Sequence, residues 1–133
     1  MKKIVVSILF ILPVFAIAQK EFPEVEEAQE EVFEAVENSP VYPGGDSVRQ
    51  AFIVKNIVYP DSAIKHQREG KVYIKFVVEK DGSVSNVHSV KSFDDDCAAE
   101  AIRVTKMMRW IPGTQRGKAV RVWVVMPIVF RLY

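Results

Sequence analysis

Alternating apolar and polar positions mark the end of the chain as one long β-strand. Between Lys118 and Leu132 every second residue is apolar, and these residues are Val120, Val122, Val124, Met126, Ile128, Phe130 and Leu132. A period of two is typical of a strand with one buried face. Pro127 lies inside this strand and has no N–H for a neighbouring strand, so the pattern predicts a sheet edge or a bulge. Because a long apolar edge recruits other chains, we expect a partner to pair with it, which favours a binding module over an enzyme.

Two further strands precede this one and are joined by a tight turn. The first has alternating apolar residues, which are Val72, Ile74, Phe76 and Val78. The segment Lys80-Asp81-Gly82 is typical of a hairpin turn. The return strand, from Val84 to Val90, has apolar residues at irregular spacing, which predicts a short or bulged strand.

Helix signals complete the pattern. The turn Pro43-Gly44-Gly45 precedes a first helix capped by Asp46 or Ser47, and this helix stops ahead of Tyr59-Pro60. Its predicted apolar face consists of Val48, Ala51 and Phe52. Pro60 then begins a second helix that ends before Gly70. A third helix starts at the three aspartates 94–96, and its apolar stripe consists of Cys97, Ala101, Val104 and Met108. The predicted order is αα-β-β-α-β, an α+β fold in which helices pack on a three-stranded antiparallel sheet.

The first 39 residues divide into two parts. Lys2 and Lys3 precede an apolar run, residues 4–18, that ends in Ala16-Ile17-Ala18. This arrangement predicts a secretory signal peptide, residues 1–18, that is cleaved after Ala18, and the alternative is an uncleaved anchor. Residues 19–39 form an acidic arm with eight glutamates against a single lysine. The folded domain is predicted over residues 40–133, where basic residues are in excess, and the arm either folds back on it or stays solvated.

Within the arm, Val25, Ala28, Val32 and Ala35 fit one face of a helix, and the segment from Val32 to Val36 fits a short strand equally well.

The side chains offer little for catalysis. His66 and His88 have no Cys, Asp or Glu nearby at metal-ligand spacing, and Cys97 belongs to the apolar stripe of the third helix. With one cysteine in the chain there is no internal disulfide. The sequence therefore predicts no enzyme, no metal and no cofactor.

Basic residues near the end of the chain raise the question of an anionic partner. They are Arg103, Lys106, Arg109, Arg116, Lys118 and Arg121. A solvated face is the first interpretation, and attachment to an anionic cell-wall polymer is the alternative. Nucleic acid is not expected as a partner, because the chain is predicted to be exported and no aromatic residues interleave with these charges.

Several motifs occur together in a fixed order. They are Tyr59-Pro60-Asp61-Ser62-Ala63, the stretch from Gly70 to Phe76 running on to Asp81-Gly82-Ser83-Val84, Trp110-Ile111-Pro112-Gly113, and Pro127-Ile128-Val129-Phe130. In order and spacing the chain resembles the C-terminal domain of TonB and its relatives. The segment from Val41 to Gly45 is also similar to the opening segment of one branch of this family. The resemblance covers about residues 31–132.

This resemblance implies a periplasmic module that grips outer-membrane transporters in energy-dependent transport. In the family, the final strand accepts a short extended peptide of the transporter, the TonB box, and the loop with the Tyr-Pro pair contacts the same peptide. Carried over to this chain, the partner-binding residues are Tyr59, Pro60, Val122, Trp123, Val124, Val125, Met126, Ile128 and Phe130. Backbone pairing supplies much of the affinity in such strand addition, and alternate side chains supply selectivity.

The chain departs from a full TonB ahead of the domain. A full TonB has a membrane anchor that meets an ExbB–ExbD motor and then a long Pro-rich span, whereas an arm of about 21 residues reaches roughly 75 Å at full extension. The leading hypothesis is therefore a periplasmic binding module. The alternative is a short energy transducer, anchored in the inner membrane by its uncleaved signal and engaged by an ExbB–ExbD-type motor. An open strand edge also allows pairing with a second copy, which would give a homodimer.

Overall fold

The computed structural model describes residues 30–133 of the chain. The predicted signal peptide, its cleavage after Ala18 and the first part of the acidic arm lie outside these residues. Within residues 30–133 no helix is both long and apolar enough to cross a membrane.

Three antiparallel strands form the centre of the sheet, as predicted. They are β2 (Gly70–Val78), β3 (Val84–Lys91) and β5 (Lys118–Phe130). β2 lies between the other two, and its ladder with β5 runs without a shift from the pair Gly70–Phe130 to the pair Val78–Val122. The β2–β3 ladder contains two register shifts, and Asn86 in β3 has a φ of 50°. The irregular return strand is therefore confirmed.

The predicted count of three strands was too low, because two very short strands also pair with β5. β1 (Val32–Phe33) runs parallel to it, and β4 (Gly113–Gln115) runs antiparallel and reaches it through a tight turn. Arg116 and Gly117 form that turn with φ values of 51° and 75°. Segments this short carry no periodic pattern, so their pairing depends on contacts with distant residues.

The helices are α1 (Asp46–Asn56), α2 (Asp61–Lys65) and α3 (Asp95–Lys106). The start of α3 is as predicted, because the Asp94 carboxylate accepts the Cys97 N–H at 2.8 Å. The start of α1 differs: Gly45, with a φ of 91°, precedes it, and no side chain caps its first turn.

The prediction that α2 extends almost to Gly70 was wrong. The helix ends at Lys65, and Gln67 leaves it with a φ of 53°. Gly70 is instead the first residue of β2, and it has no room for a side chain, because an added Cβ would lie 2.7 Å from the Phe93 ring.

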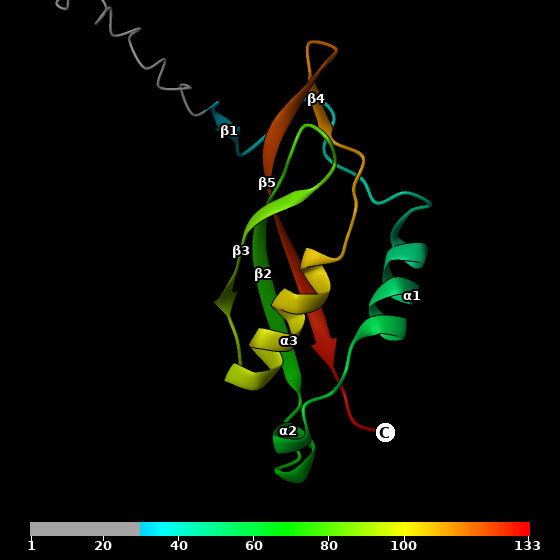
Figure 1. The fold of residues 1–133 in the computed structure, drawn as a ribbon, viewed down its shortest axis with the longest axis vertical. Helices are drawn as coiled ribbons and strands as arrows, with labels where there is room; N and C mark the ends of the chain where they lie inside the picture. The colour runs from blue at the N-terminus through cyan, green and yellow to red at the C-terminus, as the bar shows by residue number, and fades with distance from the viewer. Residues whose placement is uncertain (1–29) are drawn as a thin grey trace, which may run out of the picture. The chain divides into compact units, whose positions relative to one another are not determined.

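The core lies between one face of the sheet and the helices, and α3 runs across that face in Figure 1. Its members come from the helices, from β2 and β5 and from the segment after α3, and they include Ile53, Ile74, Phe76, Cys97, Val104, Met108, Trp110, Met126, Ile128 and Phe130. The apolar stripe predicted for α3 is buried along its whole length, which confirms that its cysteine fills the core. The alternating residues of β5 therefore face the helices, and its other face stays partly exposed.

Candidate partner-binding site

β5 has two different edges. From Val122 to Phe130 one edge is paired with β2, whereas β1 pairs with the other edge at Arg121 and Val122. Beyond Val122, no strand in the described part of the chain pairs with this second edge. We call the stretch of it from Trp123 to Phe130 the open edge.

Pro127 fixes which backbone groups face the open edge. It pairs with Tyr73 in the middle of an unbroken ladder, so its nitrogen has to face away from β2. Successive residues of a strand direct their backbone groups to opposite sides, so Val125 and Val129 present their N–H groups to the open edge as well. The proline leaves a gap between two donors, and such a gap weakens uncontrolled pairing with other chains.

A groove of about 440 Å³ adjoins the end of the open edge. Its walls come from α1, from the segment after α1 and from the end of the chain, and its lining residues are Gln50, Val54, Ile57, Tyr59, Val129, Phe130, Arg131 and Tyr133. Val54 of α1 and Val129 of β5 both line the groove, and their exposed fractions are 73% and 52%. Figure 1 shows α1 beside β5, on the side away from β2. The site thus combines the backbone groups of the open edge with an adjacent groove that is lined mainly by apolar and aromatic side chains.

The opposite edge of the sheet, formed by β3, is a poorer template. Its ladder is interrupted twice and one of its residues is in the left-handed region. An added strand needs a regular row of donors and acceptors, and β5 offers one with a single donor missing at Pro127, whereas the interrupted β3 does not.

Tyr59 lines the groove, and Pro60 follows it at the start of α2. The Tyr59 ring packs edge-on against Phe130 with a centroid distance of 5.4 Å, and its hydroxyl donates to the Arg68 carbonyl. Burial raises the pKa of this hydroxyl, which keeps it a donor. Pro60 starts α2, and its carbonyl accepts the N–H groups of Ala63 and Ile64 at 3.0 Å each. Tyr59 therefore forms part of the groove wall, and Pro60 sets the turn that places it.

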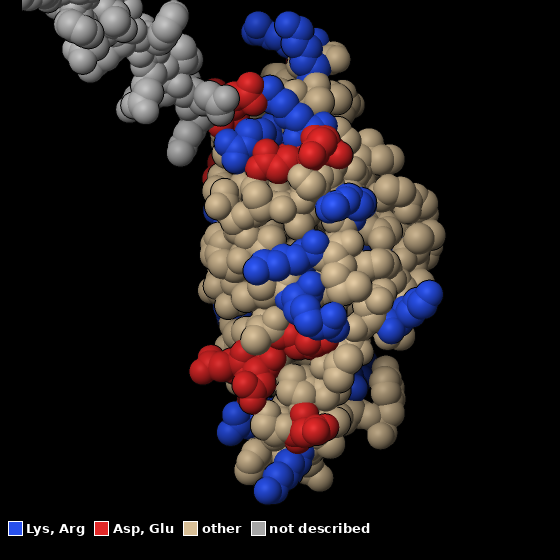
Figure 2. All heavy atoms as spheres, viewed as in Figure 1, with Lys and Arg blue, Asp and Glu red and all other residues tan. Residues whose placement is uncertain are grey.

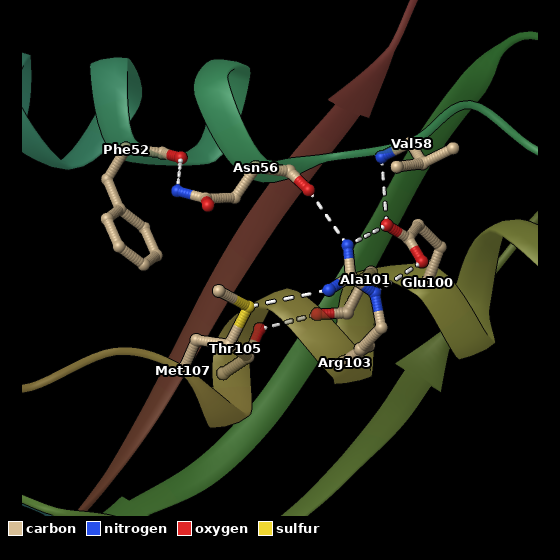
Figure 3. Close-up of polar contacts among 8 residues, drawn as sticks. All are labelled: Phe52, Asn56, Val58, Glu100, Ala101, Arg103, Thr105 and Met107. Carbon is tan, nitrogen blue, oxygen red and sulfur yellow. Dashed lines mark hydrogen bonds and ion pairs between the residues drawn. The ribbon is translucent and has the colours of Figure 1, made fainter.

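A charged pair on α3 holds the segment that carries Tyr59, as Figure 3 shows. Glu100 accepts the Val58 N–H at 2.8 Å and is paired with Arg103, which donates to the Asn56 carbonyl at 2.8 Å. Hydrogen bonding from Arg103 holds the pKa of Glu100 below its usual range, so the carboxylate stays ionised. The end of α1 and one wall of the groove are thereby fixed to the third helix.

The other residues predicted to bind a partner fall into two groups. Val122, Met126, Ile128 and Phe130 have buried side chains, and their backbone groups face β2, so they support the open edge from within and offer a partner strand no hydrogen bond. Val125 is 54% exposed, and Trp123 is half-buried with the Lys75 ammonium 4.8 Å from its ring centroid. Val124 is half-buried and packs against the core.

Sequence reasoning missed the contribution of α1 to the site. Its predicted apolar face was Val48, Ala51 and Phe52, yet Val48 and Ala51 are exposed and Ile53 is the buried residue. Val54 was the one available sign of this contribution. It is an apolar residue of α1 that stays exposed next to the buried Ile53.

Two side chains considered above for catalysis or metal binding pack against other residues. Cys97 is fully buried, and burial raises the pKa of its thiol to about 12. His88 lies edge-on against Trp123, with ring centroids 6.2 Å apart. Among residues 30–133 no cluster of three potential metal ligands occurs.

The predicted basic patch is not continuous. Arg103 is paired with Glu100, and Arg121 is paired with Glu79 at 2.8 Å on another element. On the face shown in Figure 2, Lys and Arg side chains are spread along the molecule and are separated by uncharged and acidic residues.

Comparison with known proteins gives a family match over most of the described domain. A family model described as Gram-negative bacterial TonB protein C-terminal matches residues 55–132. None of the curated proteins matches the chain.

The solved structures that are similar to it include TonB C-terminal domains of two bacteria. The NMR structure of a longer Helicobacter pylori TonB C-terminal fragment is 25% identical, with 65% of this chain and 78% of that chain covered and a TM-score of 0.49. A shorter fragment of the same protein is 26% identical, with coverages of 63% and 89% and a TM-score of 0.49. The Pseudomonas aeruginosa TonB C-terminal domain is 23% identical, with coverages of 57% and 78% and a TM-score of 0.47.

Proposed function

Because the chain belongs to the TonB C-terminal family, we propose that it binds a segment of an outer-membrane transporter by adding that segment as a strand to β5. Members of this family are envelope proteins of Gram-negative bacteria that take part in energy transduction to outer-membrane transporters. They act as interaction modules and not as enzymes. The proposal adds the place and the manner of binding in this chain.

The open edge beside the groove is the observation that carries the proposal. A strand laid against Trp123 to Phe130 finds N–H groups at Val125 and Val129 and carbonyl groups between them. Each such hydrogen bond contributes about 0.5–1.5 kcal/mol net. Side chains of the added strand reach Val125 on the exposed face of the sheet and Val54 across the groove.

Tyr59 and Pro60 support binding through the shape of the groove. Since the Tyr59 ring is packed on Phe130 and its hydroxyl is engaged by the backbone, it presents a rigid surface. A rigid wall loses little conformational entropy on binding.

A periplasmic location with the signal cleaved after Ala18 completes the proposal. The alternative, an anchored chain that meets an ExbB–ExbD-type motor, differs in the first residue of the mature protein. Mass spectrometry of the protein from its native envelope distinguishes the two, since cleavage yields a chain that begins at Gln19.

Two exposed valines give a matched test of the binding edge. Val125 in β5 and Val90 in β3 are 54% and 53% exposed, and their strands lie on opposite sides of β2. The probe is a synthetic TonB-box peptide from a transporter encoded in the same genome, titrated calorimetrically. We expect Val125→Asp to weaken binding at least about tenfold, because an unpaired carboxylate is then buried beside the added strand. Val90→Asp serves as the control and leaves the affinity unchanged. Equal affinities for the two variants, or a loss with Val90→Asp alone, would refute the proposal.

A further inference from the structure

β1 lies on the same side of β5 as the open edge, at the two residues just before the open edge begins. Val32 and Phe33 pair in parallel with Arg121 and Val122, on the side of β5 away from β2. The chain then leaves β5 next to Trp123, where the open edge begins. This segment lies ahead of residues 55–132, the stretch that the family model matches.

A few residues after β1, the chain is hydrogen-bonded to β4. The Glu37 N–H donates to the Gln115 side chain at 2.9 Å, and Asn38 and Thr114 exchange two backbone hydrogen bonds at 3.1 and 2.9 Å. β1 is therefore tethered close to β5, and a short tether of this kind gives a high effective concentration, on the order of millimolar.

The pairing of β1 itself is weak. The strand is two residues long, and both side chains are half-buried. The ion pair that follows it joins Glu34 to Lys75 at 3.9 Å, with the Glu34 side chain 75% exposed. An exposed pair at this distance contributes about 0–1 kcal/mol. The hydrogen bonds of Glu37 and Asn38 thus supplement a pairing of only two residues.

We propose that β1 is an internal competitor that closes one end of the partner-binding edge and is displaced when a partner strand extends past Trp123. This inference rests on the proposed function, because it concerns the regulation of the same edge. The closed form pairs Arg121 and Val122 within the chain, and the open form makes them available to the partner.

Population arithmetic sets the size of the effect. The apparent affinity of a partner that needs the open form is reduced by the fraction of molecules that are open. If at most about one molecule in ten is open, detaching β1 strengthens binding at least about tenfold.

A double substitution in the full chain detaches β1. Successive N–H groups of a strand point to opposite sides, so one of the two residues must donate toward β5, and Val32→Pro with Phe33→Pro removes that donor in either case. Ala35→Pro is the matched control, since Ala35 is exposed and unpaired with β5. Phe33→Ala, which keeps the backbone donor and removes the half-buried ring, is a milder second variant.

The probe is the synthetic peptide of residues 31–37, Glu-Val-Phe-Glu-Ala-Val-Glu, added to each protein. We expect the double variant to bind it at least about tenfold more tightly than the wild type and the Ala35→Pro control, with Phe33→Ala in between. Circular dichroism checks that each protein is folded. Equal affinities for the wild type and a folded variant with β1 detached, or no binding by that variant, would overturn the inference.

A second titration separates this inference from the proposed function. If no protein binds the TonB-box peptide while the double variant binds the 31–37 peptide, the proposed function fails and the competitor role of β1 stands. If the TonB-box peptide binds every protein while the 31–37 peptide does not distinguish them, the competitor role fails and the proposed function stands.

Discussion

A second proline in β5, at position 124 or 125, gives the sharpest test of the geometry of this strand. Val125 presents its N–H to the open edge, whereas Val124 presents its N–H to β2, where it pairs with Phe76. Proline at position 125 therefore removes a donor that the proposed partner uses, and proline at position 124 removes a donor of the fold. Sequence reasoning treats these two positions as equivalent, and the structure separates them.

The expected magnitudes differ accordingly. Val124→Pro loses one ladder hydrogen bond, about 1 kcal/mol, and leaves a carbonyl of β2 without its donor, which costs about 1–3 kcal/mol more. We expect its free energy of unfolding to fall by about 2–4 kcal/mol, a large part of the 5–15 kcal/mol of a typical domain. Val125 is 54% exposed and its N–H faces away from β2, so Val125→Pro changes stability by about 1 kcal/mol or less.

Urea unfolding followed by tryptophan fluorescence measures the stability of both variants, and calorimetry with the TonB-box peptide measures their binding. Val125→Pro should fold normally and bind at least about tenfold more weakly, since the partner loses a hydrogen bond and keeps an unpaired carbonyl. A Val125→Pro protein as unstable as Val124→Pro would show that the assigned orientation of the backbone is wrong. A stable Val125→Pro protein with unchanged affinity would show that the partner binds elsewhere.

Three further predictions concern the fold that supports the site. Gly82 has a φ of +85°, and an added Cβ would lie 2.1 Å from the Trp110 carbonyl oxygen, so Gly82→Ala should lower the free energy of unfolding by about 2–4 kcal/mol. Gly117→Ala is the control and should lower it by about 1 kcal/mol, because Gly117 has a φ of +75° but open space around it. The Cys97 thiol, with its pKa raised to about 12 by burial, should react with a thiol reagent near pH 8 about 100-fold more slowly in the folded protein than in urea, and equal rates would contradict its burial. Hydrogen bonding from Arg121 lowers the pKa of Glu79. This pair therefore stabilises the fold at pH values above the pKa of the carboxyl group in the unfolded chain, and the stabilisation is lost as the pH falls through the lowered pKa of the folded protein. Urea titrations between about pH 6 and pH 3 should show a smaller decline in the free energy of unfolding for Arg121→Gln than for the wild type.

The predictable part of the fold is the part with a periodic pattern. β5 repeats apolar residues every two positions, and α3 repeats them every three or four, so both elements and their buried faces follow from local sequence. Asp94 was recognisable as a cap because a carboxylate at that position satisfies free N–H groups in any protein.

The site was only half predictable, for a physical reason. Pro127 and the alternation of β5 indicate an open edge, but the groove forms where Val54 and Tyr59 meet Val129, and nothing local in the sequence brings these residues together. β1 and β4 exist because of their pairing with β5, and their few residues have no preference strong enough to identify them alone.

Amide hydrogen exchange by NMR, with and without a TonB-box peptide, tests most directly whether β5 captures a partner strand. The account predicts that the peptide slows exchange at Val125 and Val129, whose N–H groups face the open edge, and leaves the amides of β3 unchanged. Slower exchange along β3, or no change at Val125 and Val129 in a saturated complex, would contradict strand addition at β5.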